Sequence, residues 1–299
     1  MLALSLLVTD LQKSFGVNKA VDRLTFHAKP GKAFGLLGRN GAGKTTTIRS
    51  IIGLISFESG SILWKDKPIK VSRPKIGYLP EERGLYPKVT VIEQLNFFAS
   101  LERMDKHSAN KAIKYWLEKL NIEEYKKKKV EELSKGNQQK VQIISALLHD
   151  PELIILDEPF SGLDPVNSDL LSSIIKELLA SNKTIIISSH QMHYIERFCE
   201  DICILKKGKT VLAGNLNDIK RSYGRNTLII KSEYNIEDAI KQVGGNVVDK
   251  MNNSWTIKVK KEDDAHHIIQ ELVNNKIKIL GYEIKEPTLH EIFIDKVDE

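Results

Sequence analysis

The sequence predicts an α/β protein built on a phosphate-binding loop and followed by a smaller α+β domain. Three observations predict this fold class. Residues 38–45 have the spacing Gly-x4-Gly-Lys-Thr between a strand-like and a helix-like segment. From residue 153 to 206, buried apolar strands alternate with helical patterns, which is typical of a parallel sheet covered by helices. Beyond residue 226, the expected order of elements is β-α-β-β-α-β, the split arrangement of ferredoxin-like domains.

The phosphate-binding loop lies between an apolar strand expected over residues 33–37 and a helix expected over 45–52. The helix N-terminus adds partial positive charge. Lys44 is expected to reach the β- and γ-phosphates, and the Thr45 hydroxyl to bind Mg²⁺. The glycines of the loop allow positive φ and bring backbone N–H groups close to phosphate oxygens. These glycines are Gly38, Gly41 and Gly43.

The spacing of apolar residues divides the rest of the first domain into strand-like and helical segments. Residues 4–75 are mostly strand-like around the loop, whereas apolar i, i+3, i+4 spacing predicts a helical subdomain over about 91–149. Buried strands then return. We expect strands at 6–8, 24–26, 61–64, 153–156, 184–188 and 202–206, and helices at 166–180 and 191–199.

Two adjacent acids, Asp157 and Glu158, end a buried apolar strand. The carboxyl ends of parallel strands are where ligands bind in an open α/β sheet. Because consecutive strand residues point to opposite faces, the two acids are expected to take different roles. Asp157 is expected to hold Mg²⁺, and Glu158 to orient and deprotonate the attacking water.

The character of the chain changes over residues 214–226, which are polar and contain two glycines. We therefore expect a first domain at 1–220 and a ferredoxin-like domain at 225–299. In the second domain, strands are expected at 227–231, 246–250, 254–260 and 277–285, and helices at 235–243, 262–274 and 287–297.

Over residues 4–215, the chain resembles the nucleotide-binding subunit of an ABC transporter. Lys44 and Thr45 match Walker A, Asp157 and Glu158 match Walker B, and His190 resembles the switch histidine. The resemblance implies catalytic roles for Glu158, His190 and Lys44, a mixed sheet with an inserted helical subdomain, and ATP and Mg²⁺ as cofactors. The ATP-binding residues that it implies are Phe15, Val21, Gly38, Asn40, Gly41, Ala42, Gly43, Lys44, Thr45, Thr46, Ser134, Gly136 and Asp164.

Residues 133–139 resemble the signature peptide of ABC ATPases, with Lys135 and Asn137 as departures from its usual form. Ser134 is expected to cap a helix running to about His149, and the Gly136 N–H then lies at a helix N-terminus that suits a phosphate. In the family, this peptide contacts ATP on the other subunit. The resemblance therefore implies a homodimer, or a pair with a related ATPase, that two ATP molecules close.

The position of the family's Q-loop glutamine is occupied by Glu81. A carboxylate binds Mg²⁺ more strongly than an amide does, so the implied magnesium ligands are Thr45, Glu81 and Asp157. The Glu-Glu-Arg-Gly form of this loop, the signature variant and residues 287–293 resemble the bacterial sodium-extrusion branch of ABC exporters.

The composition of the chain limits which partners and which cellular location are expected. No apolar run approaches the ~18 residues that cross a bilayer, and the apolar N-terminus has no basic flank or cleavage site, so we expect no signal peptide. The resemblance implies a peripheral protein on the cytoplasmic face of the membrane, docked on an integral-membrane permease. Cys199 and Cys203 are expected to be packed thiols, which suits the cytosol.

A second hypothesis is that the chain is a soluble ABC ATPase that acts on nucleic acid or ribosomes. The net charge of +6 favours it only weakly, because the dense basic run at 126–129 is flanked by glutamates. Ribosome-acting ABC ATPases usually fuse two ATPase units in one chain, and DNA-repair types insert a long coiled coil between the two Walker motifs. This chain carries one ATPase unit, and residues 91–149 are too short for such an insertion. We therefore expect no nucleic acid partner. A non-catalytic regulatory subunit is a third hypothesis, and the presence of both Glu158 and His190 argues against it.

Overall fold

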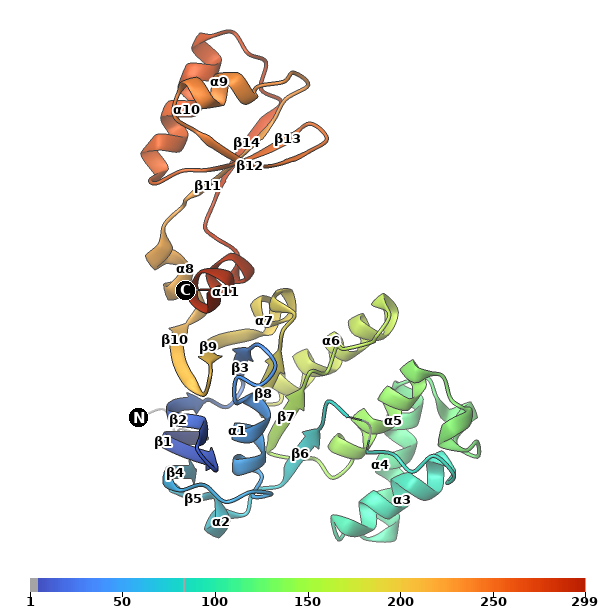
Figure 1. The fold of residues 1–299 in the computed structure, drawn as a ribbon. Coiled ribbons are helices and arrows are strands. Elements are labelled where there is room, and N and C mark those ends of the chain that lie inside the picture. The colour runs from blue at the N-terminus through green and yellow to red at the C-terminus, as the bar shows by residue number, and fades with distance from the viewer. Residues whose placement is uncertain (1–4, 83, 299) are drawn as a thin grey trace. The chain divides into compact units, whose positions relative to one another are not determined.

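The computed structural model describes residues 5–82 and 84–298, and it divides into two compact units, Met1–Ala213 and Gly214–Glu299 (Figure 1). Residues 1–4, part of the apolar N-terminus, lie outside the described residues. The division falls before helix α8 (Leu216–Tyr223), seven residues earlier than the boundary expected at 220. The Tyr223 hydroxyl donates a hydrogen bond to Asp295 at 3.0 Å, which ties α8 to the second unit.

A six-stranded sheet with the order β10-β9-β3-β8-β7-β6 organises the first unit. Its strands are β3 (Ala33–Gly38), β6 (Ile76–Leu79), β7 (Leu153–Asp157), β8 (Thr184–Ser189), β9 (Cys199–Lys206) and β10 (Lys209–Asn215). β3 pairs in parallel with β8 and β9, and β7 pairs in parallel with β6 and β8. Every residue of β3, β7 and β8 is buried, as their apolar runs predict for central strands.

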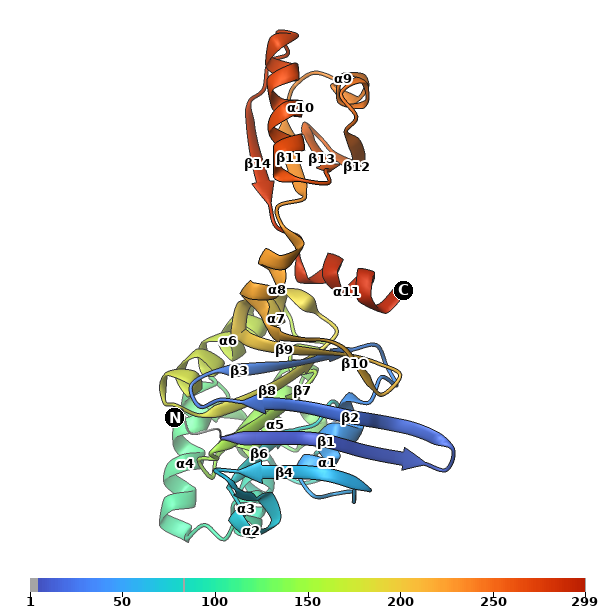
Figure 2. The same cartoon turned by 90° about the vertical axis from the view of Figure 1, so that its left-hand side faces the viewer.

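A separate antiparallel sheet has the order β2-β1-β4-β5. Its strands are β1 (Leu6–Phe15), β2 (Asn18–Ala28), β4 (Ser59–Trp64) and β5 (Lys67–Pro68). Helix α1 (Lys44–Ile51) buries Ile48 and Ile51 in one apolar cluster with side chains of both sheets. This shared core fixes α1, and with it the loop before α1, against the parallel sheet (Figure 2).

The remaining helices of the first unit include the expected helical subdomain. The bounds are α2 (Ile69–Ser72), α3 (Val91–Leu101), α4 (Lys106–Lys119), α5 (Lys135–Leu147), α6 (Pro165–Ala180) and α7 (Met192–Phe198), with 3-10 turns η1 (Glu123–Tyr125) and η2 (Val130–Glu132). Helix α4 begins at Lys106 because the Asp105 carboxylate caps it by accepting the N–H groups of His107 and Ser108.

The thiols of Cys199 and Cys203 are buried, as expected for packed cysteines. Burial raises the pKa of both thiols, that of Cys203 to about 11. Neither thiol is therefore poised to react.

The second unit has the predicted β-α-β-β-α-β order, and its antiparallel sheet has the order β12-β13-β11-β14. The bounds are β11 (Thr227–Lys231), α9 (Glu237–Gln242), β12 (Asn246–Met251), β13 (Ser254–Lys258), α10 (Glu262–Asn274), β14 (Gly281–Lys285) and α11 (Leu289–Asp298). β14 starts later than the expected residue 277, because it pairs only with β11 and that ladder ends at Lys231 opposite Gly281. Within the described ranges, every helix is too short or too polar to cross a bilayer.

Trp255 should anchor the core of the second unit. The side chain is 1% exposed among the apolar residues of this unit. Trp255→Ala should therefore cost about 3–5 kcal/mol of unfolding free energy in this unit through lost burial and a cavity. Urea unfolding followed by circular dichroism measures the loss. Tyr282→Ala, on an exposed ring of the same sheet, is the control and should change stability by less than about 0.5 kcal/mol. Equal losses in the two variants would contradict this account of the core.

Candidate functional site

The carboxyl ends of β3, β8, β7 and β6 meet at one edge of the parallel sheet. Asp157 at the end of β7 lies opposite Ser188 of β8, and Ser189 lies opposite Leu37 of β3. The loops that leave these strands are therefore neighbours. Open α/β sheets bind ligands at this edge.

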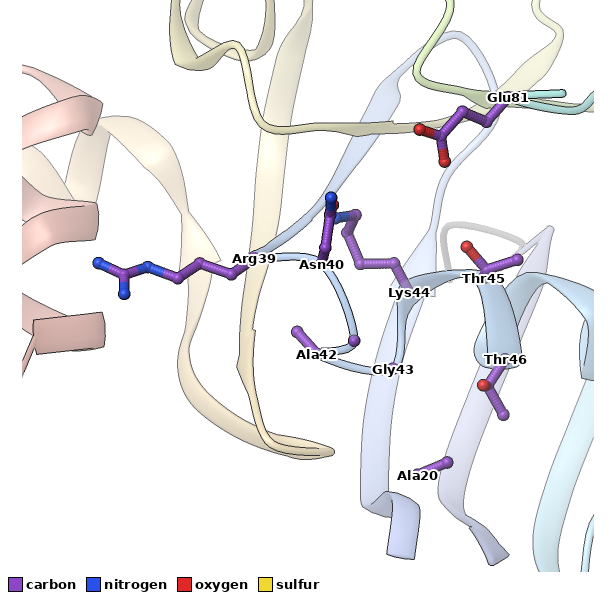
Figure 3. A pocket seen from close by; sticks show the side chains of 10 residues that line it. Ala20, Arg39, Asn40, Ala42, Gly43, Lys44, Thr45, Thr46 and Glu81 are labelled. Atoms are coloured by element: carbon purple, nitrogen blue, oxygen red, sulfur yellow. The ribbon is translucent and has the colours of Figure 1, made fainter. Parts of the chain in front are cut away.

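The loop between β3 and α1 borders a cavity of about 210 Å³ (Figure 3). Gly43 has a φ of 111°, and a Cβ at this position would lie 2.4 Å from the carbonyl oxygen of Ala20, so only glycine fits. The first turn of α1 also lines the cavity, which places the positive end of the helix dipole there. The lining residues are Ala20, Arg39, Asn40, Gly41, Ala42, Gly43, Lys44, Thr45, Thr46 and Glu81.

The Lys44 ammonium links the start of the loop to the acidic pair. Its Nζ donates a hydrogen bond to the Gly38 carbonyl at 2.6 Å and lies 3.9 Å from Oε1 of Glu158. The side chain is only 7% exposed. A buried cation within reach of the loop is the group that a phosphate anion needs.

Asp157 is 2% exposed and held by two hydroxyl groups. Its Oδ1 accepts a short hydrogen bond from Ser188, and its Oδ2 accepts one from Thr45 at 3.4 Å. Burial raises the pKa of this carboxyl, and the negative charge of Glu158 adds to the rise, although the Ser188 hydrogen bond and the Lys44 charge oppose it. Burial therefore disfavours the ionised form of Asp157.

Glu158 directly follows β7 and has a φ of 50°, in the left-handed region that is costly for residues other than glycine. Its Oε2 accepts hydrogen bonds from the Ser189 hydroxyl and the His190 N–H, both at 3.3 Å, and lies 2.8 Å from Nδ1 of His190. Its Oε1 is buried and has no hydrogen-bond partner among the described residues. This atom has the free lone pairs that a general base uses to accept a proton from water.

The donor set fits Mg²⁺. Thr45, Asp157 and Glu81 offer only oxygen atoms, which Mg²⁺ prefers, and Mg²⁺ usually takes one or two carboxylates together with water and substrate phosphates. The described ranges hold no cluster of three or more His, Cys, Asp or Glu side chains that could bind a metal ion. When bound, Mg²⁺ would neutralise phosphate charge and polarise the terminal phosphoryl group.

Six of the expected ATP-binding residues do not line the cavity: Phe15, Val21, Gly38, Ser134, Gly136 and Asp164. Val21 is 0% exposed in the apolar core, and its neighbour Ala20 lines the cavity instead. We therefore replace Val21 with Ala20 in the proposed site. Phe15, at the end of β1, does not line the cavity; its ring is 55% exposed, and the Lys13 ammonium lies 5.2 Å from the ring centroid.

The expected signature residues Ser134 and Gly136 lie at the N-terminus of α5, and the expected ATP-binding residue Asp164 lies at the N-terminus of α6, rather than along the cavity. Ser134 caps α5 by accepting the Asn137 N–H at 3.3 Å. Asp164 caps α6 by accepting the N–H and the side-chain amide of Asn167 at 2.9 and 2.6 Å. A Cβ on Gly136 would lie 2.9 Å from Nδ2 of Asn167, so the two helix starts are adjacent. Figure 1 shows α5 and α1 in separate parts of the first unit.

Sequence reasoning missed the hydroxyls of Ser188 and Ser189, which hold Asp157 and Glu158. Polar side chains at the end of the otherwise apolar β8 were the available signal. It also missed Arg39 and Ala20, whose place beside the cavity depends on the loop conformation.

The glycine loop, the buried lysine and the acidic pair at one sheet edge together define a P-loop nucleoside-triphosphatase site. A family model for ABC transporters matches residues 21–161, and a model for the C-terminal domain of DrrA1-3-like ATP-binding proteins matches residues 214–297.

Relatives and solved structures agree with these matches. The chain is 48% identical over 293 residues to the ABC transporter ATP-binding protein YhaQ of Bacillus subtilis, covering 98% of each chain. It is 31% identical over 299 residues to the linearmycin resistance ATP-binding protein LnrL of the same species, covering 96% of each. A solved ATP-binding subunit of an ABC transporter is 32% identical with a TM-score of 0.68, covering 73% of this chain and 93% of that one. The chain therefore belongs to the ATP-binding proteins of ABC transporters and is an ATPase.

Asp157→Asn should raise the melting temperature of the nucleotide-free protein near neutral pH. A carboxyl group whose pKa is raised on folding binds protons more tightly in the folded than in the unfolded state, so its contribution to stability falls as pH rises above its ordinary pKa. The gain of the variant should therefore shrink as the pH falls toward the ordinary pKa of an aspartate carboxyl. Thermal unfolding across pH measures this dependence.

Asp164→Asn is the control with the opposite sign. The Asn167 N–H is the main cause that lowers the pKa of Asp164, so this carboxylate stabilises the fold above its ordinary pKa, and its loss should lower the melting temperature at neutral pH. A melting temperature of Asp157→Asn at or below that of the wild type at neutral pH would contradict the assigned cost of burying Asp157.

Proposed function

We propose that this protein is the motor subunit of an exporter, in which ATP closes a pair of these ATPases and hydrolysis reopens it to drive a separate membrane permease. One observation carries the proposal. The cavity beside Lys44 has about 210 Å³, below the ~300–1,000 Å³ typical of pockets that bury a drug-sized ligand. A cavity of this size encloses only part of a nucleotide, which supports a site that a second chain completes.

The N-terminus of α5 supplies the missing part from a second copy. Ser134 and Gly136 lie where a helix end offers N–H groups and positive partial charge, and neither residue lines the cavity beside Lys44. Head-to-tail pairing brings the signature helix of each copy to the phosphate loop of the other. Both nucleotides then lie between the two chains, in a homodimer or a pair with a related ATPase.

Hydrolysis uses the groups around β7. Lys44 holds the β- and γ-phosphates, with Asp157 and Thr45 at the metal. Oε1 of Glu158, which has no hydrogen-bond partner among the described residues, accepts the proton of the attacking water, and His190, 2.8 Å from the other carboxylate oxygen, positions Glu158 and contacts the γ-phosphate. Loss of the γ-phosphate removes these contacts, so the pair reopens.

Exposed rings support the adenine contact and the permease partner. The Phe15 ring is free to stack on adenine, a contact typically worth ~1–3 kcal/mol. On the helical subdomain, Tyr86 and Phe97 form an exposed edge-to-face pair with centroids 5.8 Å apart, and Leu101 on α3 is 60% exposed. An exposed apolar patch of this kind suits a membrane subunit that docks at the cytoplasmic face.

The transported species is proposed only as a class. The linearmycin resistance named for LnrL supports export of a solute. The form of the loop around Glu81 and of the signature peptide supports sodium as one candidate. In this proposal, the membrane permease determines which species is transported.

Glu158→Gln should slow ATP hydrolysis by ~10²-fold or more, because the amide cannot accept the proton from water. It should also trap an ATP-bound dimer. Steady-state phosphate release and gel filtration with MgATP measure the two effects. Glu152→Gln removes the same charge just before β7, where Glu152 pairs with Lys65, and should change neither. Unchanged turnover in Glu158→Gln would overturn the assignment of the base.

Ser134→Arg should leave ATP binding to the single chain within about twofold but prevent dimer formation, because the long side chain blocks the helix N-terminus that faces the second nucleotide. Nucleotide titration and gel filtration in the Glu158→Gln background measure the two properties. Asp105→Arg removes the cap of α4 in the same subdomain and serves as the control for cap loss, typically ~1 kcal/mol. Normal dimers of Ser134→Arg would contradict the shared site.

A further inference from the structure

The segment after β6 brings Glu81 to the cavity that the phosphate loop lines (Figure 3). β6 pairs in parallel with β7, so its carboxyl end lies beside the strand that carries Asp157. In Figure 3 the Glu81 carboxylate points toward the loop residues Lys44 and Thr45. A carboxylate at this place contributes a full negative charge to a site built for polyanions.

Tyr78 on β6 lies within electrostatic reach of both the Glu81 and the Asp157 carboxylate. Burial is the main cause that raises the pKa of Tyr78 on β6 to about 12, and the carboxylates of Asp157 and Glu81 both add to the rise. Glu81 lines the cavity, Asp157 is hydrogen-bonded to Thr45 of its lining, and Glu158 lies 3.9 Å from Lys44 of its lining, so three acidic side chains line or contact this phosphate loop. An uncharged amide at position 81 would leave two.

Gln142 holds Glu81 in this place. The Gln142 side chain is 4% exposed, and its Nε2 donates to the carbonyls of Pro80 at 3.2 Å and of Glu82 at 3.1 Å. These carbonyls flank Glu81 on both sides, so its backbone is clamped. Because Gln142 belongs to α5, the helix that Ser134 caps, the clamp also joins the metal side of the site to the signature helix.

We propose that Glu81 makes the nucleotide affinity of this ATPase depend on a divalent cation more steeply than an amide at the same position would. With the cation, the carboxylate is an additional oxygen ligand. Without it, the same charge repels the terminal phosphates. The inference rests on the proposed function and deepens it, because it makes the metal a condition for binding as well as for hydrolysis.

The experiment compares nucleotide affinity with and without metal. The dissociation constant of a fluorescent ATP analogue is measured for the purified full chain in excess Mg²⁺ and in excess EDTA. Wild-type affinity should fall steeply in EDTA. Glu81→Gln should bind about tenfold tighter than the wild type in EDTA, which corresponds to roughly 1.4 kcal/mol, and no tighter in Mg²⁺.

Glu82→Gln is the matched control. It removes the same charge one residue away, Glu82 does not line the cavity, and its contact with Gln142 uses the backbone carbonyl. Its ratio of EDTA to Mg²⁺ dissociation constants should equal that of the wild type. An equal ratio in the wild type and Glu81→Gln would overturn the inference, as would the same change in Glu82→Gln.

The clamp has its own test. Gln142→Met keeps the approximate size of the side chain but removes the donor, so Glu81 is released and the ratio should fall toward that of Glu81→Gln. An unchanged ratio in Gln142→Met would overturn the positioning role of Gln142. Failure of the wild type to bind the analogue in Mg²⁺ would instead contradict the proposed function, so the two failures are distinguishable.

Discussion

The parallel pairing of β7, β8 and β3 sets where every reactive group of the first unit lies. Because the strands run in the same direction, their carboxyl ends meet at one edge of the sheet, and the register aligns them. The strand pairing therefore brings Asp157, Ser188 and the loop before α1 together at this edge. The same pairing leaves the signature helix in another part of the unit, and from this separation we infer a site shared between two chains.

Local motifs were predictable because their chemistry depends on residues adjacent in sequence. The phosphate loop needs its glycines and lysine at fixed spacing, and the acidic pair needs only the end of a buried strand. Val21 shows the limit. Side chains alternate between the two faces of a strand. Val21 therefore lies in the apolar core, whereas its neighbour Ala20 lines the cavity.

Other features depended on pairing partners that the sequence does not display. The hydroxyls of Ser188 and Ser189 matter only because β8 lies beside β7. The late start of β14 follows from the length of β11, and the division before α8 follows from a contact with α11. The clamp of Gln142 on the segment around Glu81 joins residues about sixty positions apart, beyond the reach of any local pattern.

The most direct test of the shared site is cross-linking between two differently labelled chains in the Glu158→Gln background, one with Asn40→Cys and the other with Ser134→Cys. The native thiols are buried and should not react. We predict that a short bifunctional thiol reagent joins the two chains only when ATP and Mg²⁺ are present. Cross-linking that is absent, or equal with and without ATP, would contradict a nucleotide held between the phosphate loop of one copy and the signature helix of the other.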